Sequence, residues 1–233
     1  FLDYYPEENP DQIRVAHHGG GEHFTPASPE DAATARRRCD IPEGVPFILC
    51  LTTLEPRKGL EHTIRAFIAL LGSFPSPAPH LVIVGRKGWR YSPILKAARN
   101  CADEIHFTGF LPDATVRGLL TACDCFVFMS RYEGFGLPLV EAMACGAAVI
   151  ASNATVIPEI VGDAALLLPP QDVDALAESM RLLCADSALR SKLRKAALQR
   201  AKHFTWEKCA ETMVQSMRSS IGTQAEKCNE TTR

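Results

Sequence analysis

The sequence predicts an α/β protein built on a Rossmann-like, doubly wound parallel sheet. Two observations lead to this fold class. Short, continuous apolar runs recur between residues 47 and 168, as expected for strands buried on both faces. Segments with apolar residues at helical spacing separate these runs. Strands that alternate with helices imply right-handed βαβ crossovers, and therefore a parallel sheet covered by helices.

The elements follow in chain order. Residues 1–30 are irregular apart from the apolar run 13–16, a possible strand, and residues 30–38 favour a short helix. The predicted strands are 47–51, 80–85, 104–108, 125–129, 147–151 and 165–168. The predicted helices are 60–71, 92–100, 113–122, 138–145, 172–184, 187–202 and 205–219. We expect Asp113 to cap its helix and Pro138 to occupy the first helical position, where proline is favoured. Residues 221–233 are polar and predicted to be disordered.

The composition is that of an ordinary globular protein. Its 233 residues are 46% hydrophobic and carry a formal charge of −2, which argues against a nucleic-acid binder driven by overall positive charge. Most of the nine cysteines lie in apolar runs, which favours buried thiols and a reducing, cytoplasmic compartment over a disulfide framework. No apolar run reaches the roughly 18 residues of a membrane span. Because the sequence begins with Phe1, we expect a fragment or a cut domain.

The chemically informative residues follow the predicted strands, where doubly wound sheets bind their ligands. In the stretch EGFGLPLVE (133–141), two glycines precede a helix N-terminus, an arrangement suited to an anion such as a diphosphate. Glu133 and Glu141 offer carboxylates to sugar and ribose hydroxyls. Because neither can neutralise a phosphate, the positive charge must come from Arg57 and Lys58, after another strand.

Each feature also has a plain structural explanation. The glycines could serve only the turn, Glu141 could compensate the helix dipole, and Arg57 and Lys58 could be a solvated pair. Their coincidence at the strand ends of one sheet favours a binding site. Three functions remain open: a transferase half, a non-catalytic nucleotide-sugar-binding module, and a glycoside hydrolase that uses Glu133 and Glu141 as paired carboxylates.

Nearly the whole chain resembles the retaining glycosyltransferases called group 1 or family 4, which have the GT-B fold of two Rossmann-like halves. The resemblance rests on FILCLTTLEPRKGLEHTIRAF (47–67), on LVIVGRKGW (81–89), on the long run HFTGFLPD…LLLPPQD (106–172), and on FTWEKCAETMVQSMR (204–218). It implies that the chain is the C-terminal, donor-binding half. Residues 1–40 would then be an interdomain connection with a remnant of the N-terminal domain, residues 41–204 the nucleotide-sugar-binding domain, and residues 205–220 the C-terminal helix.

The resemblance also implies roles for individual residues. Glu133 would be the catalytic-site residue that positions the donor sugar, and Glu141 would bind the ribose. Phe110 and Leu111 would flank the base. The donor diphosphate would contact Arg57, Lys58, Gly134, Phe135, Gly136 and Leu137.

Two positions depart from the family pattern. Thr52 stands where the family usually has glycine, which could narrow the space near the phosphates, and Met129 replaces a proline whose role we expect to be structural. The acceptor-binding half is absent, so we expect no transfer by this chain alone. Membrane association, at the inner face, would come only through that half.

We expect no metal or other cofactor. The acidic DxD clamp for a metal-bound diphosphate, typical of the other major glycosyltransferase fold, is expected to be absent, and His17, His18 and His23 fit no standard zinc spacing. The expected partner is a nucleotide sugar. The LEPRKG and GRKGW segments resemble mannosyltransferase-type members, which favours GDP-mannose as the donor.

Overall fold

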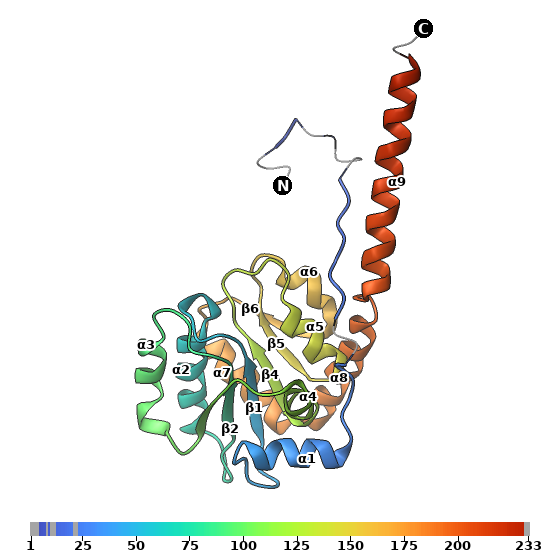
Figure 1. Cartoon of the computed structure of the whole chain (residues 1–233). Helices are drawn as coiled ribbons and strands as arrows, with labels where there is room; N and C mark the ends of the chain where they lie inside the picture. The colour runs from blue at the N-terminus through green and yellow to red at the C-terminus, as the bar shows by residue number, and fades with distance from the viewer. Residues whose placement is uncertain (1–4, 8, 10–12, 21–22, 231–233) are drawn as a thin grey trace. The chain divides into compact units, whose positions relative to one another are not determined.

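The computed structural model describes residues 5–7, 9, 13–20 and 23–230, with side chains up to residue 219. The chain forms two compact units (Figure 1). Residues 20–202 make the larger unit, which contains the sheet. Residues 1–19 and 203–233 make the smaller one, and each unit is considered by itself.

A six-stranded parallel sheet in the order β3-β2-β1-β4-β5-β6 forms the centre of the larger unit. Its strands are β1 (Phe47–Leu51), β2 (His80–Val84), β3 (Ile105–Gly109), β4 (Cys125–Phe128), β5 (Val149–Ser152) and β6 (Ala165–Leu168). The strand order reverses between β1 and β4, which pair through Ile48 and Cys125. This is the topology of a doubly wound Rossmann-like sheet, so the predicted fold class is confirmed.

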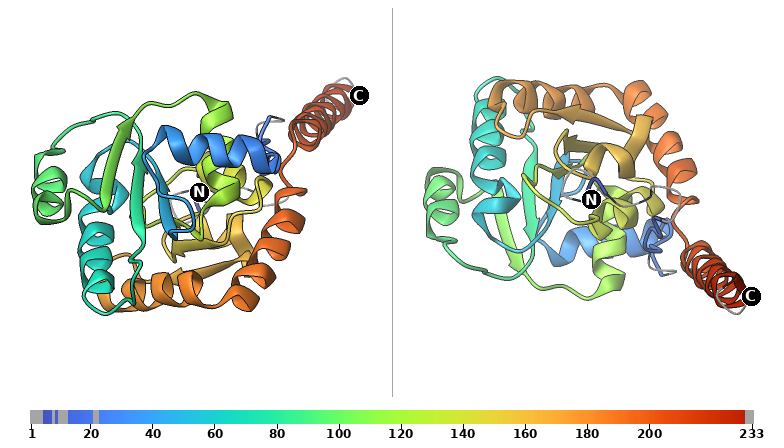
Figure 2. Two further views of the ribbon diagram at one scale, coloured as in Figure 1. Left: turned by 90° about the horizontal axis from the view of Figure 1, so that it is seen from below. Right: turned by 90° about the horizontal axis from the view of Figure 1, so that it is seen from above.

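Helices cover both faces of the sheet. The helices of this unit are α1 (Pro29–Arg38), α2 (Leu60–Leu71), α3 (Ser92–Ala97), α4 (Asp113–Ala122), α5 (Leu137–Ala144), α6 (Ile157–Val161), α7 (Val173–Ala185) and α8 (Ser187–Ala201). Single 3₁₀ turns lie at Pro56–Lys58, Arg99–Cys101 and Gly162–Ala164. Figure 2 shows α1 and α4 on one side of the sheet and α2 and α7 on the other.

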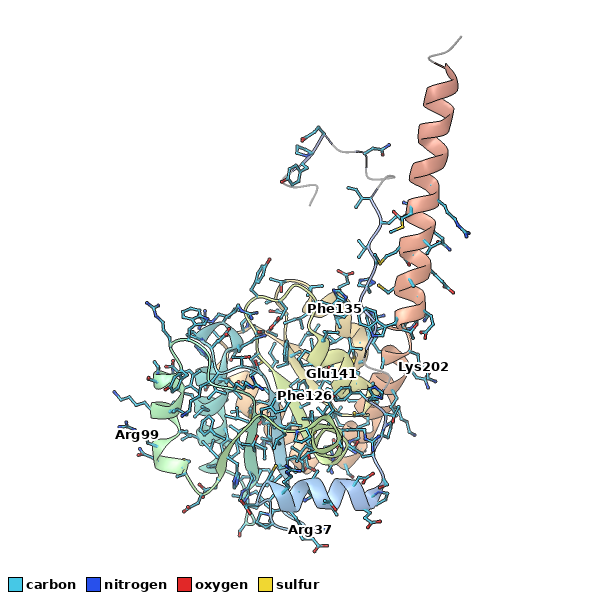
Figure 3. The ribbon with its side chains drawn as sticks, viewed as in Figure 1. Arg37, Arg99, Phe126, Phe135, Glu141 and Lys202 are labelled. Carbon is cyan, nitrogen blue, oxygen red and sulfur yellow. The ribbon has the colours of Figure 1, made fainter. Side chains whose placement is uncertain are left out.

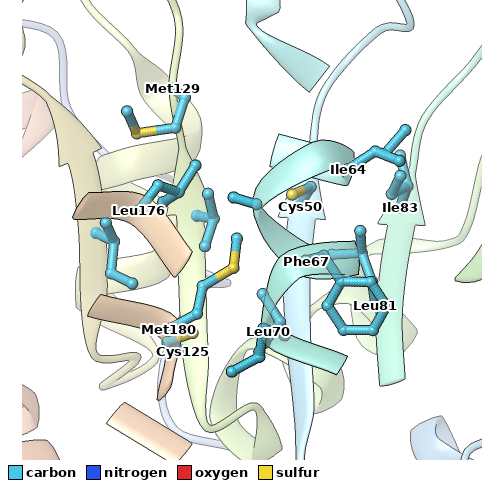
Figure 4. Packing of buried hydrophobic residues seen from close by; sticks show 14 of the residues in the cluster. Cys50, Ile64, Phe67, Leu70, Leu81, Ile83, Cys125, Met129, Leu176 and Met180 are labelled. Atoms are coloured by element: carbon cyan, nitrogen blue, oxygen red, sulfur yellow. The ribbon is translucent and has the colours of Figure 1, made fainter. Parts of the chain in front are cut away.

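The apolar face of α2 explains the main core. Ile64, Phe67 and Leu70 recur at helical spacing and are fully buried against Leu81 and Ile83 of β2 (Figure 4). Leu176 and Met180 of α7 complete the same cluster. Because both β1 and β4 are buried along their length, the centre of the sheet is a rigid platform for the loops that leave its carboxyl end.

The smaller unit consists of an extended N-terminal segment and α9 (Trp206–Glu230). The ring of His17 meets Phe204 edge-on, and that of His18 meets Trp206. Residues 13–16 form no strand, and the two histidines make aromatic contacts. None of the helices described is both long and apolar enough to cross a bilayer.

Several boundaries differ from expectation. Helix α1 packs on α4 and belongs to the sheet unit, so residues 1–40 are not one connecting segment. Helix α9 continues to Glu230, and residues 221–230 are helical where disorder was expected, because this polar stretch lacks proline and contains good helix formers. Residues 231–233 lie outside the described residues. Pro112 occupies the N-cap position of α4, and Asp113 is its first helical residue.

The cysteines behave as small apolar residues. The eight whose side chains are described are free thiols, and all but Cys101 are buried. Burial raises the pKa of Cys50 to about 12, which keeps that thiol protonated.

Candidate functional site

The loop after β1 brings its two cations toward β4. A single 3₁₀ turn, Pro56–Lys58, ends at Gly59, whose φ of 69° lies in the left-handed region. A Cβ at Gly59 would lie 2.2 Å from the carbonyl oxygen of Met129, so only glycine allows this close approach. The amide of Arg131 donates to the carbonyl of Arg57 at 2.9 Å and joins the two loops a second time.

This approach creates a charge cluster that links the first loop to Glu133. Lys58 Nζ lies 2.6 Å from Glu133 Oε1, and Arg57 Nη1 lies 3.3 Å from Glu133 Oε2. Arg57 also pairs more loosely with Glu55, at 3.8 Å. The side chains of Lys58 and Glu133 are 13% and 10% exposed, whereas Arg57 is 38% exposed, so the lysine–glutamate pair is the shielded core of the cluster.

Polar groups from three loops fix the Glu133 carboxylate. The hydroxyl of Ser130 donates to Glu133 Oε1, and the hydroxyl of Ser152 donates to the carbonyl of Ser130. The Glu133 amide donates to the hydroxyl of Thr155 at 3.2 Å. Burial alone would raise the pKa of Glu133, but hydrogen bonds from Lys58 and Ser130 outweigh it, so the pKa lies below its usual value. Glu133 is therefore an ionised, oriented carboxylate.

The glycines that follow Glu133 prepare the start of α5. Gly136 has a φ of 94° and takes the N-cap position, with Leu137 and Pro138 as the first two helical residues. A Cβ at Gly134 would meet no atom within 4 Å, so the backbone there faces open space. Figure 3 labels Phe135, just before α5, and Glu141, on the helix. The turn before α5 thus faces open space at Gly134, whereas in the first turn of the helix Pro138 has no amide hydrogen and the amide of Leu139 donates to the carbonyl of Gly136 at 2.9 Å.

A cleft of about 440 Å³ lies beside this helix, at the carboxyl end of the sheet. It runs from the loop after β1 to the loop after β3, and both Lys58 and Glu141 line it. The other lining residues come from four loops, from the ends of β1 and β2, and from the first turns of α4 and α5: Phe24, Leu51, Thr52, Thr53, Val84, Gly85, Arg86, Phe110, Leu111, Asp113, Val116 and Pro138. The volume and the apolar lining with a few charged groups are typical of a small-molecule site.

Glu141 is the most perturbed carboxyl group of the cleft. Burial raises its pKa to about 7, and the nearby charge of Asp113 acts in the same direction. No basic residue contributes to this shift. Glu141 therefore differs from Glu133, since its acidic group changes charge near neutral pH and is not committed to a cation.

The structure separates the predicted site residues into two groups. Lys58, Glu141, Phe110 and Leu111 line the cleft. Arg57, Glu133 and the Gly134–Leu137 turn lie outside its lining, and Lys58 joins the two groups because it belongs to both. Thr52 also lines the cleft.

Two charged lining residues were missed as site residues by the sequence reasoning. Arg86 lines the cleft with its Cζ 4.9 Å from the ring centre of Phe110, which is 64% exposed. Asp113 lines it at the start of α4. Both residues follow predicted strands. Their expected position at the carboxyl end of the sheet could therefore have identified them as site residues.

Acidic and histidine side chains do not gather into a metal centre in the described part of the chain, where no group of three suitable ligands occurs. One triplet, Asp172-Val173-Asp174, does match DxD, contrary to expectation. Asp172 is the N-cap of α7, and its carboxylate accepts from the amide of Ala175 at 2.9 Å. The triplet thus serves to begin a helix.

Comparison with known proteins gives a consistent result. The family model described as glycosyl transferases group 1 matches residues 31–200. The chain is 36% identical over 165 residues to O-antigen chain mannosyltransferase B of Escherichia coli, covering 70% of this chain and 43% of that protein. It is 31% identical over 205 residues to the GDP-mannose-dependent monoacylated alpha-(1-6)-phosphatidylinositol monomannoside mannosyltransferase of Corynebacterium glutamicum, covering 84% and 53%.

A solved structure agrees with these relatives. Sucrose-phosphate synthase from Thermosynechococcus elongatus superposes with a TM-score of 0.74 at 30% identity, over 90% of this chain and 53% of that one. The chain therefore spans about half the length of these three proteins.

Proposed function

The chain belongs to the group 1 glycosyl transferases, and from that membership we propose that it is the donor-binding half of a transferase that uses a nucleoside-diphosphate sugar. The single observation that carries the proposal is the cleft. It combines Lys58, a partly buried cation, with Glu141, a carboxyl group that pairs with no cation among the described residues, at the carboxyl end of one sheet. A diphosphate needs the first group and ribose hydroxyls suit the second.

The parts of the donor find matching groups in order along the cleft. The diphosphate lies near Lys58 and the N-terminus of α5, where cationic and amide groups meet. The ribose hydroxyls donate to Glu141. The base lies beside Phe110 and Leu111, which line the same cleft.

Glu133 positions the donor sugar in this proposal. Its carboxylate is ionised and held by Lys58, Arg57 and Ser130, so it can accept hydrogen bonds from sugar hydroxyls at a fixed place. The same contacts mean that a bound diphosphate shares the two cations with Glu133. The diphosphate therefore binds beside an ion pair that is already formed. The Lys58 ammonium group has three hydrogens, so it can donate to Glu133 and to a phosphate oxygen at the same time.

GDP-mannose is the donor that we propose. Its support is the pair of mannosyltransferase relatives, one of which is named as GDP-mannose-dependent. We propose that donor binding needs no metal, because Lys58 and Arg57 supply positive charge around the phosphate position. If this is right, a chelator leaves the affinity for GDP-mannose unchanged.

Transfer itself needs a second half. The relatives are about twice as long as the matched region, and we propose that the remaining part of such a protein binds the acceptor hydroxyl. This chain alone would then bind donor without transferring sugar. We further propose that the complete enzyme retains the anomeric configuration, which proton NMR of the first-formed product would test.

The glycoside hydrolase alternative has no support from the site. A hydrolase needs its two carboxyl groups on either side of one scissile bond, but Glu133 is paired with two cations outside the cleft lining, and only Glu141 lines the cleft. Membership of a transferase family also disfavours it.

Isothermal titration calorimetry with GDP, GDP-mannose, UDP-glucose and guanosine tests the proposed function. We expect a one-to-one complex with the nucleoside diphosphates, weaker binding of guanosine, and the highest affinity for the guanine-containing donors. A higher affinity for UDP-glucose than for GDP-mannose would support the proposed donor-binding role but contradict the choice of GDP-mannose as the donor. No binding of any nucleoside diphosphate would contradict the proposal as a whole.

A further inference from the structure

A basic surface lies outside the donor cleft, in the segment that joins β2 to β3. Residues 86–102 contain five cations and no acidic residue. Elsewhere in the chain 20 cations face 27 acids, so the rest of the protein is net negative. We define the basic loop patch as Lys87, Trp89, Arg90, Lys96 and Arg99, and leave out Arg86 because it lines the cleft.

The loop that carries this patch is held firmly on the sheet. The amide of Leu54 donates to the carbonyl of Arg86 at 2.9 Å, and the amide of Gly88 donates to the carbonyl of Leu54 at 3.2 Å. A Cβ at Gly88 would lie 2.6 Å from Glu55 Cγ, so the loop packs closely on its neighbour. The exposed residues after Gly88 therefore project from a fixed base.

An aromatic side chain stands at the centre of the patch. Trp89 is 55% exposed, and Arg90 Cζ lies 5.7 Å from its ring centre. Lys87 Nζ lies 5.3 Å from the ring centre of Tyr91, which packs against the core. Cations and rings are thus interleaved over a few residues, the combination that suits the headgroup region of a bilayer.

Helix α3 extends the patch. Its buried side is formed by Ile94, while Lys96 and, in the following 3₁₀ turn, Arg99 are exposed. Figures 1 and 3 show α3, with Arg99 labelled, at the edge of the larger unit beyond β2. Two acids adjoin the patch: Glu55, whose side chain lies against Gly88, and Asp103, which follows the 3₁₀ turn.

We propose that the basic loop patch docks the protein on an anionic lipid surface. The cations face the lipid phosphates, and Trp89 enters the headgroup region. The rest of the chain is net negative, and what distinguishes the basic loop patch from the cations of α8 is the exposed ring of Trp89 beside its cations. This proposal differs from the expectation that membrane contact comes only through an acceptor-binding half.

Vesicle co-sedimentation of the chain tests the proposal. Equimolar phosphatidylglycerol and phosphatidylcholine vesicles should bind it at physiological ionic strength, pure phosphatidylcholine vesicles should not, and high salt should release it. Since each cation near such a surface contributes about 1 kcal/mol, the double variant Lys96→Gln/Arg99→Gln should bind about 30-fold more weakly. The matched control is Lys192→Gln/Lys195→Gln, which removes two exposed cations with the same spacing from α8.

Fluorescence adds a readout of orientation. The chain has two tryptophans, so Trp206→Phe leaves Trp89 as the single reporter, and anionic vesicles should shift its emission to the blue. Absence of vesicle binding, or equal loss in the α8 control, would overturn the proposal. Tighter binding of a single-stranded oligonucleotide, with the same dependence on Lys96 and Arg99, would assign the patch to nucleic acid instead. Circular dichroism checks that the variants are folded.

Discussion

Lys58 and Glu133 are 75 residues apart in the sequence, yet Lys58 Nζ lies 2.6 Å from Glu133 Oε1 in a largely buried pair. The pair joins the loop after β1 to the loop after β4, on either side of the point where the strand order reverses. The charge of Glu133 therefore contributes to the stability of the fold as well as to the chemistry of the site.

The first prediction concerns the stability that this pair contributes. The pKa of Glu133 is lowered in the folded protein, so its contribution is present above the unfolded pKa and is lost as the pH falls through the folded value. Lys58→Ala should therefore reduce the free energy of unfolding by roughly 1–3 kcal/mol at pH 7, and by much less under strongly acidic conditions. Urea unfolding at both pH values measures this, and an equal loss at both would contradict the role of the pair.

A second prediction separates the diphosphate from the nucleoside. Replacing Arg57 and Lys58 together by alanine should weaken GDP binding at least about tenfold, because two charge-assisted contacts to phosphate are lost. Guanosine binding should change little. Calorimetry with both ligands gives the comparison, and the Lys192→Gln/Lys195→Gln variant controls for net charge. A similar loss for both ligands would remove the two cations from the phosphate position.

The third prediction follows from the raised pKa of Glu141. A carboxylate accepts from ribose hydroxyls better than a carboxylic acid does, so affinity for GDP-mannose should rise as the pH increases through about 7. GDP-mannose suits the test because its diphosphate is esterified at both ends and does not titrate in this range. In Glu141→Gln the pH dependence should disappear.

Asp113 provides the matched variant for that experiment. Removing its charge in Asp113→Asn should lower the pKa of Glu141 and move the rise in affinity to lower pH. The free energy of unfolding depends on pH in the opposite direction to the affinity. Between the unfolded and folded pKa values of Glu141, the folded state holds a proton that the unfolded state releases. Ionisation of Glu141 thus costs stability progressively from about pH 4.5 to about pH 7. An unshifted midpoint in Asp113→Asn would exclude this carboxyl pair as the cause.

A fourth prediction tests the close approach of the two loops. Gly59→Ala places a Cβ against the Met129 carbonyl and also strains a backbone with positive φ. Gly44 has a similar φ of 74° and no atom within 4 Å of its Cβ position, so Gly44→Ala isolates the strain, about 1–2 kcal/mol. Gly59→Ala should cost about 1–3 kcal/mol more, the usual range for overpacking. Thermal unfolding of both variants checks the difference, and equal losses would mean that the contact with Met129 is unimportant.

The sequence predicted the sheet well because each strand is a short, continuous apolar run. A run of this kind between two helices is typical of a parallel strand that is buried on both faces. It was less successful where local composition is ambiguous. The short helix α6 follows a run of small and apolar residues and was not anticipated, and the polar end of α9 was taken for a disordered tail. The N-cap of α4 is Pro112 and not Asp113 as expected, and α5 begins at Leu137, one residue before the expected start at Pro138.

The site shows the same limit in chemical terms. Residue types at strand ends sufficed to choose Lys58, Glu133 and Glu141, but not to say which of them meet. Glu133 and the two cations were assigned separate roles from the sequence, and the structure pairs Glu133 with both cations. Arg86 follows a predicted strand but was assigned no role from the sequence, and the structure places it in the cleft beside Phe110.

The most direct test of the donor site is calorimetric titration of the wild-type chain and of Glu141→Ala with whichever nucleoside-diphosphate sugar binds best. We predict one-to-one binding to the wild type and a loss of about 1.5–3 kcal/mol in the variant, or roughly 10- to 150-fold in affinity, because a hydrogen-bond acceptor for the ribose is removed. Unchanged affinity in Glu141→Ala, or no binding to the wild type, would contradict the account.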